Sequence, residues 1–217
     1  GGGWLYYLAS PTQPTQRFLH RSSLQGGGPE RLSPADQPGT HSYEISEDAR
    51  WAVHTHSSMI SPLVVHLVSL LDHRSVRVLK GQVALRKKLA KLRLPRTEFL
   101  RADIGGGIEL DGWFITAADL DKSRQHPLLM HVYGEPAAQT VRDSWGGQRT
   151  LWHWMLAQQG YAIASVDTRG TPSPRGRDWR KSIHRQLGVM NSQEQAAATR
   201  ALLQRFAFLD PNRVGIW

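Results

Sequence analysis

The pattern of apolar and polar positions changes near Pro95, which predicts two structural regions. Before Pro95, short apolar and aromatic runs alternate with turns rich in Gly, Pro and Ser, which is typical of an array of strands. After Pro95, short apolar runs alternate with segments whose apolar residues recur at helical spacing, which favours an α/β domain. We therefore expect a strand region at residues 1–80, a linker helix at 81–96 and an α/β region at 97–217.

The strand region contains an internal repeat. Residues 4–10 (WLYYLAS) align with 51–57 (WAVHTHS) at an offset of 47 residues, and 16–24 (QRFLHRSSL) align with 62–70 (PLVVHLVSL) at an offset of 46. Repeats of about 40–50 residues that are built from short strands are typical of β-propeller blades. The repeat therefore predicts two successive blades.

Each repeat is expected to continue into a short outer strand, at 29–33 and at 75–80, and an inner strand is expected at 40–45. Residues 1–80 then correspond to a partial blade and one nearly whole blade. Two blades cannot close a ring, and open sheet edges are prone to aggregation. We therefore expect further blades upstream of Gly1.

The region after Pro95 is predicted to contain three buried strands that are connected by helices, and connections of this kind imply a parallel sheet. In chain order, the elements are a hairpin at 97–116 that turns at Gly105–Gly107, a strand at 126–134, a helix at 150–160, a strand at 161–170, a helix at 192–211 and a buried strand at 213–217. Ser192 is the expected cap of the second helix, with Glu194 in its first turn. Asp210 and Pro211 are expected to end that helix.

Positive charge is concentrated around the linker. Between Arg74 and Arg101 the sequence has ten Lys or Arg and one acid, so this stretch accounts for the whole net charge of +9. Leu85, Leu89 and Leu92 share one helical face, which predicts an amphipathic helix that docks through its leucines. The alternative is a phosphate-binding helix, which the lack of interleaved aromatic residues disfavours. No nucleic-acid partner is expected.

Several kinds of site are excluded or disfavoured. The chain has no Cys, which excludes disulfides, thiolate catalysis and Cys-based zinc sites. His54 and His56 share one face of a strand, but no third ligand is spaced to join them, so no metal is expected. Gly105–Gly107 leads into a strand and not into a helix, so it is no phosphate loop and no cofactor is expected. Ser144 and Ser173 both lack the glycine two residues earlier that a nucleophile elbow needs.

Composition leaves the cellular compartment open. The apolar content is 40% and the mean hydropathy is −0.43, which are ordinary values for a soluble protein. No run approaches the ~18–20 apolar residues of a membrane span, and no secretory signal pattern opens the sequence. The absence of Cys fits a cytoplasmic protein and equally a bacterial exported or periplasmic one. Residues 170–181 are basic and rich in Pro; we expect an ordered loop on the active-site side, and contact with an acidic partner or phosphate is the alternative.

Five parts of the sequence together resemble one protein family. They are the paired LYYLAS and SEDARWAVHTHS segments of the repeat, VRVLKGQVALRKKL in the linker, PLLMHVYGEPAAQ, VDTRGTPSPRG and FLDPNRVGIW. In combination they resemble the dipeptidyl peptidase IV branch of the prolyl oligopeptidase family of serine peptidases, along essentially the whole chain. The resemblance implies a β plus α/β fold, with the C-terminal blades of a β-propeller followed by the N-terminal half of an α/β-hydrolase domain.

The resemblance also implies roles for individual residues. In that family the strand that here ends at Trp217 runs into Gly-Trp-Ser-x-Gly-Gly, so the nucleophile, acid and base are expected beyond Trp217. Tyr133 matches the tyrosine whose hydroxyl helps to form the oxyanion hole. Asp167 and Arg169 match a family motif, for which we expect a role in loop architecture, with Arg169 paired to a carboxylate. Glu135 is given no role.

The implied activity is that of a serine-type exopeptidase, which releases N-terminal dipeptides with Pro or Ala at the second position from peptide substrates. Because Ser, Asp and His are expected outside these residues, we expect the chain alone to be inactive. The alternative is a non-catalytic propeller–hydrolase remnant that acts as a protein-binding module. The resemblance leaves open whether the parent protein is a homodimer and which peptides it prefers.

Overall fold

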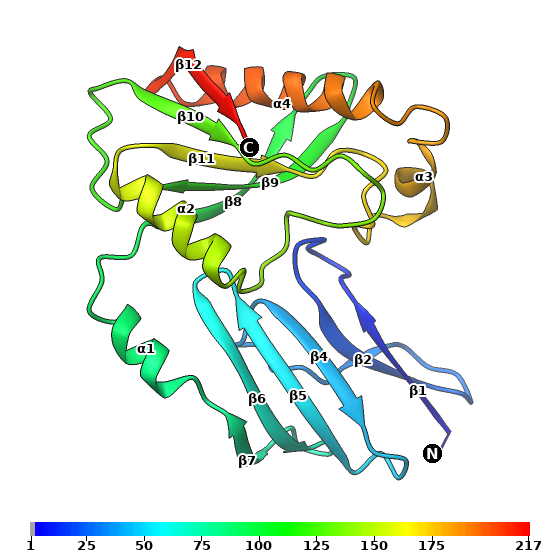
Figure 1. Ribbon diagram of the computed structural model, residues 1–217. Helices are drawn as coiled ribbons and strands as arrows, with labels where there is room; N and C mark the ends of the chain where they lie inside the picture. The colour runs from blue at the N-terminus through cyan, green and yellow to red at the C-terminus, as the bar shows by residue number, and fades with distance from the viewer. Residues whose placement is uncertain (1–2) are drawn as a thin grey trace. The chain divides into compact units, whose positions relative to one another are not determined.

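A computed structural model describes residues 3–217 (Figure 1). The chain divides into two compact units. The first comprises the residues up to Lys91 together with Arg142–Gly146, and the second comprises Leu92–Val141 and Gly147–Trp217. Each unit has its own sheets and its own core, and each is described separately.

The first unit consists of two antiparallel sheets. In order, the three-stranded sheet is β1 (Trp4–Ala9), β2 (Phe18–Ser23) and β3 (Glu30–Arg31), and the four-stranded sheet is β4 (Thr40–Ile45), β5 (Trp51–Ser58), β6 (Ser61–Ser69) and β7 (Ser75–Lys80). Neighbouring strands in each sheet follow one another in the sequence, as in the blades of a propeller. The strands expected from the repeat are therefore confirmed.

Alternation along the strands builds the core of the first unit. Ala52 of β5 is opposite Ile45 of β4 and Val68 of β6, so these three side chains share one face of the four-stranded sheet. Ala52 and Val68 are buried together with Leu19 and Leu70. Residues from both copies of the repeat thus meet in one buried cluster, with Leu19 from the first copy and Ala52, Val68 and Leu70 from the second.

Residues 142–146 are held in the first unit by Asp143. Its carboxylate accepts hydrogen bonds from Gln16 Nε2 (3.0 Å) and from the main-chain N–H of Met59 (2.8 Å). The hydroxyl of Thr40 donates to the carbonyl of Asp143 (2.8 Å). Asp143 is buried, so these partners replace the water that its charge would otherwise bind.

The linker forms the short helix α1 (Val83–Leu89). Leu89 is buried and Leu85 is half-buried, which confirms that the helix docks through these two leucines. The prediction was wrong for Leu92, whose side chain is 53% exposed. The helix ends at Leu89, so Leu92 does not continue its apolar face.

The second unit is built on one five-stranded sheet with the order β12-β10-β11-β9-β8. The strands are β8 (Arg96–Asp103), β9 (Glu109–Thr116), β10 (His126–Met130), β11 (Ala162–Val166) and β12 (Leu209–Ile216). As predicted, β8 and β9 form a hairpin, and β10 is parallel to both β11 and β12. Gly105, Gly106 and Gly107 turn the hairpin with φ of +87°, +63° and +74°, values that glycine adopts without the steric cost of a side chain.

Helices α2 (Gln148–Gln158) and α4 (Met190–Arg205) cover opposite faces of this sheet (Figure 1). Ala162, Ala164 and Val166 of β11 pack in one core with Ala198 and Leu202 of α4. The predicted helix at 150–160 is confirmed. The predicted strand at 161–170 is also present, but it ends at Val166, so residues 167–170 form a turn and not part of the strand. Residues 170–181 are ordered, but they also contain the short helix α3 (Gly176–Lys181), which the sequence pattern did not predict.

The ends of α4 differ from those predicted. The helix begins at Met190, so Ser192 lies inside it and does not cap its first turn. The hydroxyl of Ser192 instead donates to the carbonyl of Gly188 (2.6 Å). The helix ends at Arg205, so Asp210 and Pro211 lie within β12. The helix ends five residues before Asp210 because Phe206, Phe208 and Leu209 pack against the core. The ring of Phe206 stacks on that of Phe114, with 4.5 Å between their centroids.

The last strand is present as predicted, but it is not buried. Val214, Ile216 and Trp217 are 37%, 75% and 49% exposed. The reason is that β12 is an edge strand: it pairs with β10 on one side, and no strand within residues 3–217 pairs with its other side. None of the helices formed by these residues is long and apolar enough to span a membrane.

Candidate active site

The parallel strands bring three chain segments together at one edge of the sheet. Because β10, β11 and β12 run in the same direction, their carboxyl ends meet there. Pairing continues past β10: the N–H of His131 donates to the carbonyl of Ala164 (2.7 Å), and the N–H of Val132 donates to the carbonyl of Trp217 (3.0 Å). The N–H of Trp217 donates in turn to Met130 (2.9 Å). The backbone that leads into Tyr133 is therefore fixed on both sides.

Tyr133 lies at this edge, three residues after β10, and not within a strand that reaches 134 as predicted. It is half-buried and lines a cavity of about 420 Å³. The other lining residues are His131, Val132, Ala138, Gln139, Thr140, Arg149 and Trp217. The hydroxyl of Tyr133 donates to a carboxylate oxygen of Glu135 over 3.4 Å, which is long for an O–H donor. A closer acceptor in the cavity would compete for that proton.

Two buried histidines, which the sequence pattern did not single out, lie against Trp217: His131 lines the same cavity as Tyr133, and His153 lies behind it. The ring of His131 contacts Trp217 at 4.8 Å between centroids, and the ring of His153 lies 5.5 Å from that of His131. Burial lowers the pKa of both imidazoles to about 4, so they are neutral at pH 7. The signal for His153 was its position on the buried face of α2, with Thr150, Trp154 and Ala157.

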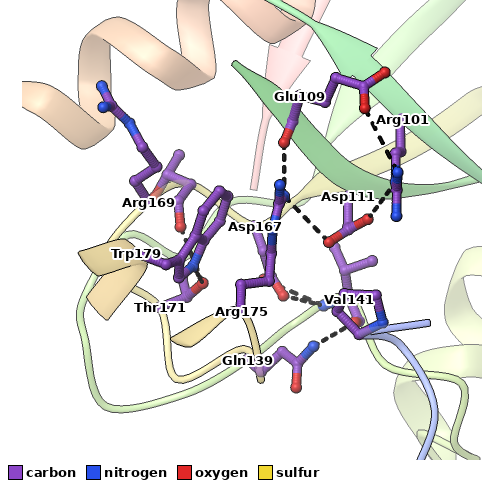
Figure 2. A network of polar contacts seen from close by, with 12 residues as sticks. Arg101, Glu109, Asp111, Gln139, Val141, Asp167, Arg169, Thr171, Arg175 and Trp179 are labelled. Atoms are coloured by element: carbon purple, nitrogen blue, oxygen red, sulfur yellow. Dashed lines mark hydrogen bonds and ion pairs between the residues drawn. The ribbon is translucent and has the colours of Figure 1, made fainter. Parts of the chain in front are cut away.

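Asp167 shapes the wall of the cavity. It follows β11, is almost completely buried, and accepts hydrogen bonds from the N–H and the hydroxyl of Thr140 (both 2.9 Å) and from the N–H of Val141 (3.2 Å). Burial raises its pKa to about 6, although these donors favour the carboxylate. Figure 2 shows Asp167 directed at the backbone of Val141, close to Gln139. The structure thus gives Asp167 the architectural position that the motif implied.

Arg169 pairs with a carboxylate, as expected, and the partner is Glu194 of α4. The Nε atom of Arg169 donates to one oxygen of Glu194, and its main-chain N–H donates to the other (2.8 Å). Glu194 is buried, so this pairing compensates its charge. The prediction that Glu194 lies in the first turn of the helix was wrong, because α4 begins at Met190 and has no acidic residue in that turn. Glu194 instead anchors the turn after β11.

A second set of charged contacts holds the loop after that turn. Arg175 donates to the carbonyl of Glu109 (2.6 Å) and to the carboxylate of Asp111 (3.3 Å), and Arg101 donates to the other oxygen of Asp111 (3.2 Å) (Figure 2). The guanidinium of Arg175 also lies over the ring of Trp179 at 3.8 Å. Asp111 is buried between the two cations. The network fixes residues 170–181 against the hairpin.

The described residues provide donors and a cation at this edge, but no nucleophile with its base. Between residues 3 and 217, one serine hydroxyl contacts an imidazole ring: Ser75 of β7 bonds to Nδ1 of His66 of β6 (2.8 Å) in the first unit. No carboxylate is hydrogen-bonded to that ring in the same range. Nor does this range contain a group of three or more His, Cys, Asp or Glu side chains arranged to hold a metal ion. His54 instead bonds to His41 (2.9 Å) in a stack of rings.

Known proteins share this arrangement. The sequence model that describes the prolyl oligopeptidase family matches residues 149–217 of this chain. The crystal structure of dipeptidyl peptidase 4 from Porphyromonas gingivalis superposes with a TM-score of 0.89 and 33% identity, over 100% of this chain and 30% of that one. The chain belongs to the prolyl oligopeptidase family. Its similarity is to the dipeptidyl peptidase branch, and the predicted fold class is confirmed.

Curated relatives in this family include the probable dipeptidyl-aminopeptidase B of Emericella nidulans, which is 27% identical over 99% of this chain and 23% of that protein. The prolyl endopeptidase FAP of Mus musculus is 32% identical over 66% of this chain and 18% of that protein. The chain therefore spans about a quarter or less of the length of these two relatives.

Proposed function

We propose that this chain is part of a serine exopeptidase that releases N-terminal dipeptides with Pro or Ala at the second position. The similarity to dipeptidyl peptidase 4 of P. gingivalis, which extends over the whole chain at 33% identity, supports this reaction class. The observation that carries the proposal is the position of Tyr133: its hydroxyl borders the cavity at the carboxyl edge of the parallel strands, next to Trp217. This edge is where α/β enzymes place their chemistry.

Tyr133 acts as an oxyanion-hole donor in this proposal. When a nucleophile attacks a peptide carbonyl, negative charge develops on the carbonyl oxygen, and a fixed O–H donor stabilises it. The contact between Tyr133 and Glu135 at 3.4 Å is weak enough to be exchanged for a contact with that oxygen. One donor of this kind is typically worth about 3–4 kcal/mol in the transition state.

We further propose that the nucleophile, base and acid come from sequence that follows Trp217, so that the 217-residue chain has no turnover of its own. Acyl transfer by this mechanism requires a serine, a histidine that takes its proton and an acid that orients the histidine. The Ser75–His66 contact does not meet this requirement, because neither residue lines the cavity and no carboxylate among residues 3–217 is bonded to His66. We keep 1–80, 81–96 and 97–217 as the proposed domain limits.

The test has two parts. First, the coding sequence after Trp217 is determined in the source DNA, where we expect Gly-Trp-Ser-x-Gly-Gly. Second, the 217-residue chain and the protein that includes this continuation are compared in glycyl-prolyl-p-nitroanilide hydrolysis and in labelling by a fluorophosphonate. We expect both signals for the longer protein and neither for the shorter chain. A stop codon directly after Trp217, or labelling of the 217-residue chain at a serine, contradicts the proposal.

A further inference from the structure

The solvent-facing side of α1 is formed by lysines. Leu85 and Leu89 turn toward the protein, and the opposite face of the helix consists of Val83, Ala84, Lys87 and Lys88, all of which are exposed. Lys91 follows two residues after the helix and is also exposed, as is Lys80 at the end of β7. We call these six residues the lysine surface. All of them belong to the first unit.

The charges of this surface are not neutralised within residues 3–217. Nearby arginines do have partners: Arg74 pairs with Asp72, and Arg86 donates to the hydroxyl of Ser61. By contrast, Lys80, Lys87, Lys88 and Lys91 make no side-chain hydrogen bond or ion pair in that range. Four unpaired positive charges within twelve consecutive residues create a local positive potential that attracts a negatively charged partner.

Apolar exposure accompanies the charge. Val83 is 63% exposed and lies on the same helical face as Lys87, one turn away. The surface contains no acidic side chain that would fix the register of an acidic protein. It also contains no aromatic ring for stacking on bases, which nucleic-acid surfaces generally use. A lysine-rich segment of this kind is attracted to anionic lipid headgroups through its charge.

We propose that the lysine surface binds the surface of an anionic lipid bilayer. The lysines contact the lipid phosphates, and Val83 enters the interfacial region. Polybasic segments bind anionic lipids through charge density, without a shaped pocket. Two of the four lysines lie in α1, and the other two flank it. Since the attraction is electrostatic, it weakens as salt shortens the Debye length. This inference is independent of the proposed peptidase function.

The test measures sedimentation of the full chain with vesicles of phosphatidylcholine alone or mixed with phosphatidylglycerol. We expect binding to the mixed vesicles only, and its loss at about 0.5 M NaCl, where charges are strongly screened. The variant K87Q/K88Q/K91Q is expected to bind at least about fivefold more weakly. The matched control R177Q/R180Q/K181Q removes the same charge from α3, and we expect it to bind within about twofold of the parent chain.

The side chains of both triple variants are exposed and make no side-chain hydrogen bond within the described residues, so we expect both to fold, which circular dichroism checks. Equal binding to neutral and anionic vesicles contradicts the proposal, because charge would then play no part. An equal loss in both triple variants also contradicts it, because net charge and not this surface would be responsible. Binding to heparin or a polynucleotide with no binding to either vesicle overturns it in favour of another polyanion.

Discussion

The main-chain N–H of Val132 donates a hydrogen bond to the carbonyl of Trp217 (3.0 Å). This contact joins the residue before Tyr133 to the last residue of the chain, although 85 positions separate them in the sequence. It places the phenol of Tyr133 and the end of β12 at one cavity. A nucleophile carried by residues after β12 would therefore start from the same place as the proposed oxyanion donor.

The buried histidine stack makes the first unit sensitive to acid. Burial lowers the pKa of His41 to about 4 and that of His54 to about 3, and the nearby charges of His56, His73 and, for His41, Arg31 act in the same direction. In the unfolded chain these histidines have a pKa near 6.5, so below that pH they bind protons that the folded stack does not bind. The free energy of unfolding is therefore highest above pH 6.5 and decreases as the pH falls. We expect a loss of about 2–4 kcal/mol between pH 7.5 and 4.5.

Urea unfolding at several pH values measures this effect. The variant His54→Gln keeps a donor for His41 but removes one titrating group, so we expect its stability to depend less steeply on pH. Asp167 acts in the opposite direction, because its raised pKa makes the folded state lose stability as the pH rises toward about 6. A free energy of unfolding that is unchanged from pH 7.5 to 4.5 in both proteins would rule out this account of the stack.

Removing Arg169 leaves the charge of Glu194 buried without its cation. We expect Arg169→Ala to lower the stability of the second unit by about 3 kcal/mol, because loss of one partner of a buried pair exposes the full desolvation cost of the other. The matched control is Arg50→Ala, whose partner Asp48 is exposed and whose loss should cost less than about 1 kcal/mol. Chemical denaturation measures both. Equal effects would show that burial of the Arg169–Glu194 pair has no energetic consequence.

Gly170 follows directly after Arg169 and has no space for a side chain. Its φ is +95°, and an added Cβ would lie 2.5 Å from the Cβ of Ile183. We expect Gly170→Ala to cost about 3 kcal/mol or more, because backbone strain and overpacking act together. Gly26→Ala is the control, since Gly26 has a φ of +102° but nothing within 4 Å of the added Cβ, and strain alone costs about 1 kcal/mol. Similar thermal shifts for the two variants would contradict the packing argument.

The strands of the first unit were predictable because their signal is local and occurs twice. Both copies contain strand-forming runs separated by turns, and in the second copy Ala52 and Val68 lie opposite each other on the buried face of the sheet. The end of α4 was not predictable in this way. Asp210 and Pro211 are strong helix breakers, yet the helix stops earlier because Phe206 stacks on Phe114, which is distant in the sequence.

The candidate site was predictable only in part for the same reason. Tyr133, Asp167 and Arg169 belong to recognisable motifs, so their positions after the parallel strands β10 and β11 could be expected from the fold. The position of His153 on the buried face of α2 follows from helical spacing. Nothing in the local sequence, however, indicates that its ring lies 5.5 Å from that of His131, which follows β10. Likewise, nothing near Glu194 in the sequence indicates that Arg169 is its partner.

Tyr133→Phe tests the central claim most directly, in the protein that includes the sequence after Trp217. We expect kcat for glycyl-prolyl-p-nitroanilide to fall about 10²- to 10³-fold, with KM nearly unchanged, because the hydroxyl acts on charge that exists only in the transition state. Tyr161→Phe, at an exposed tyrosine of the same unit, should leave kcat unaltered. An undiminished kcat in Tyr133→Phe would contradict the assignment of Tyr133 as the oxyanion donor.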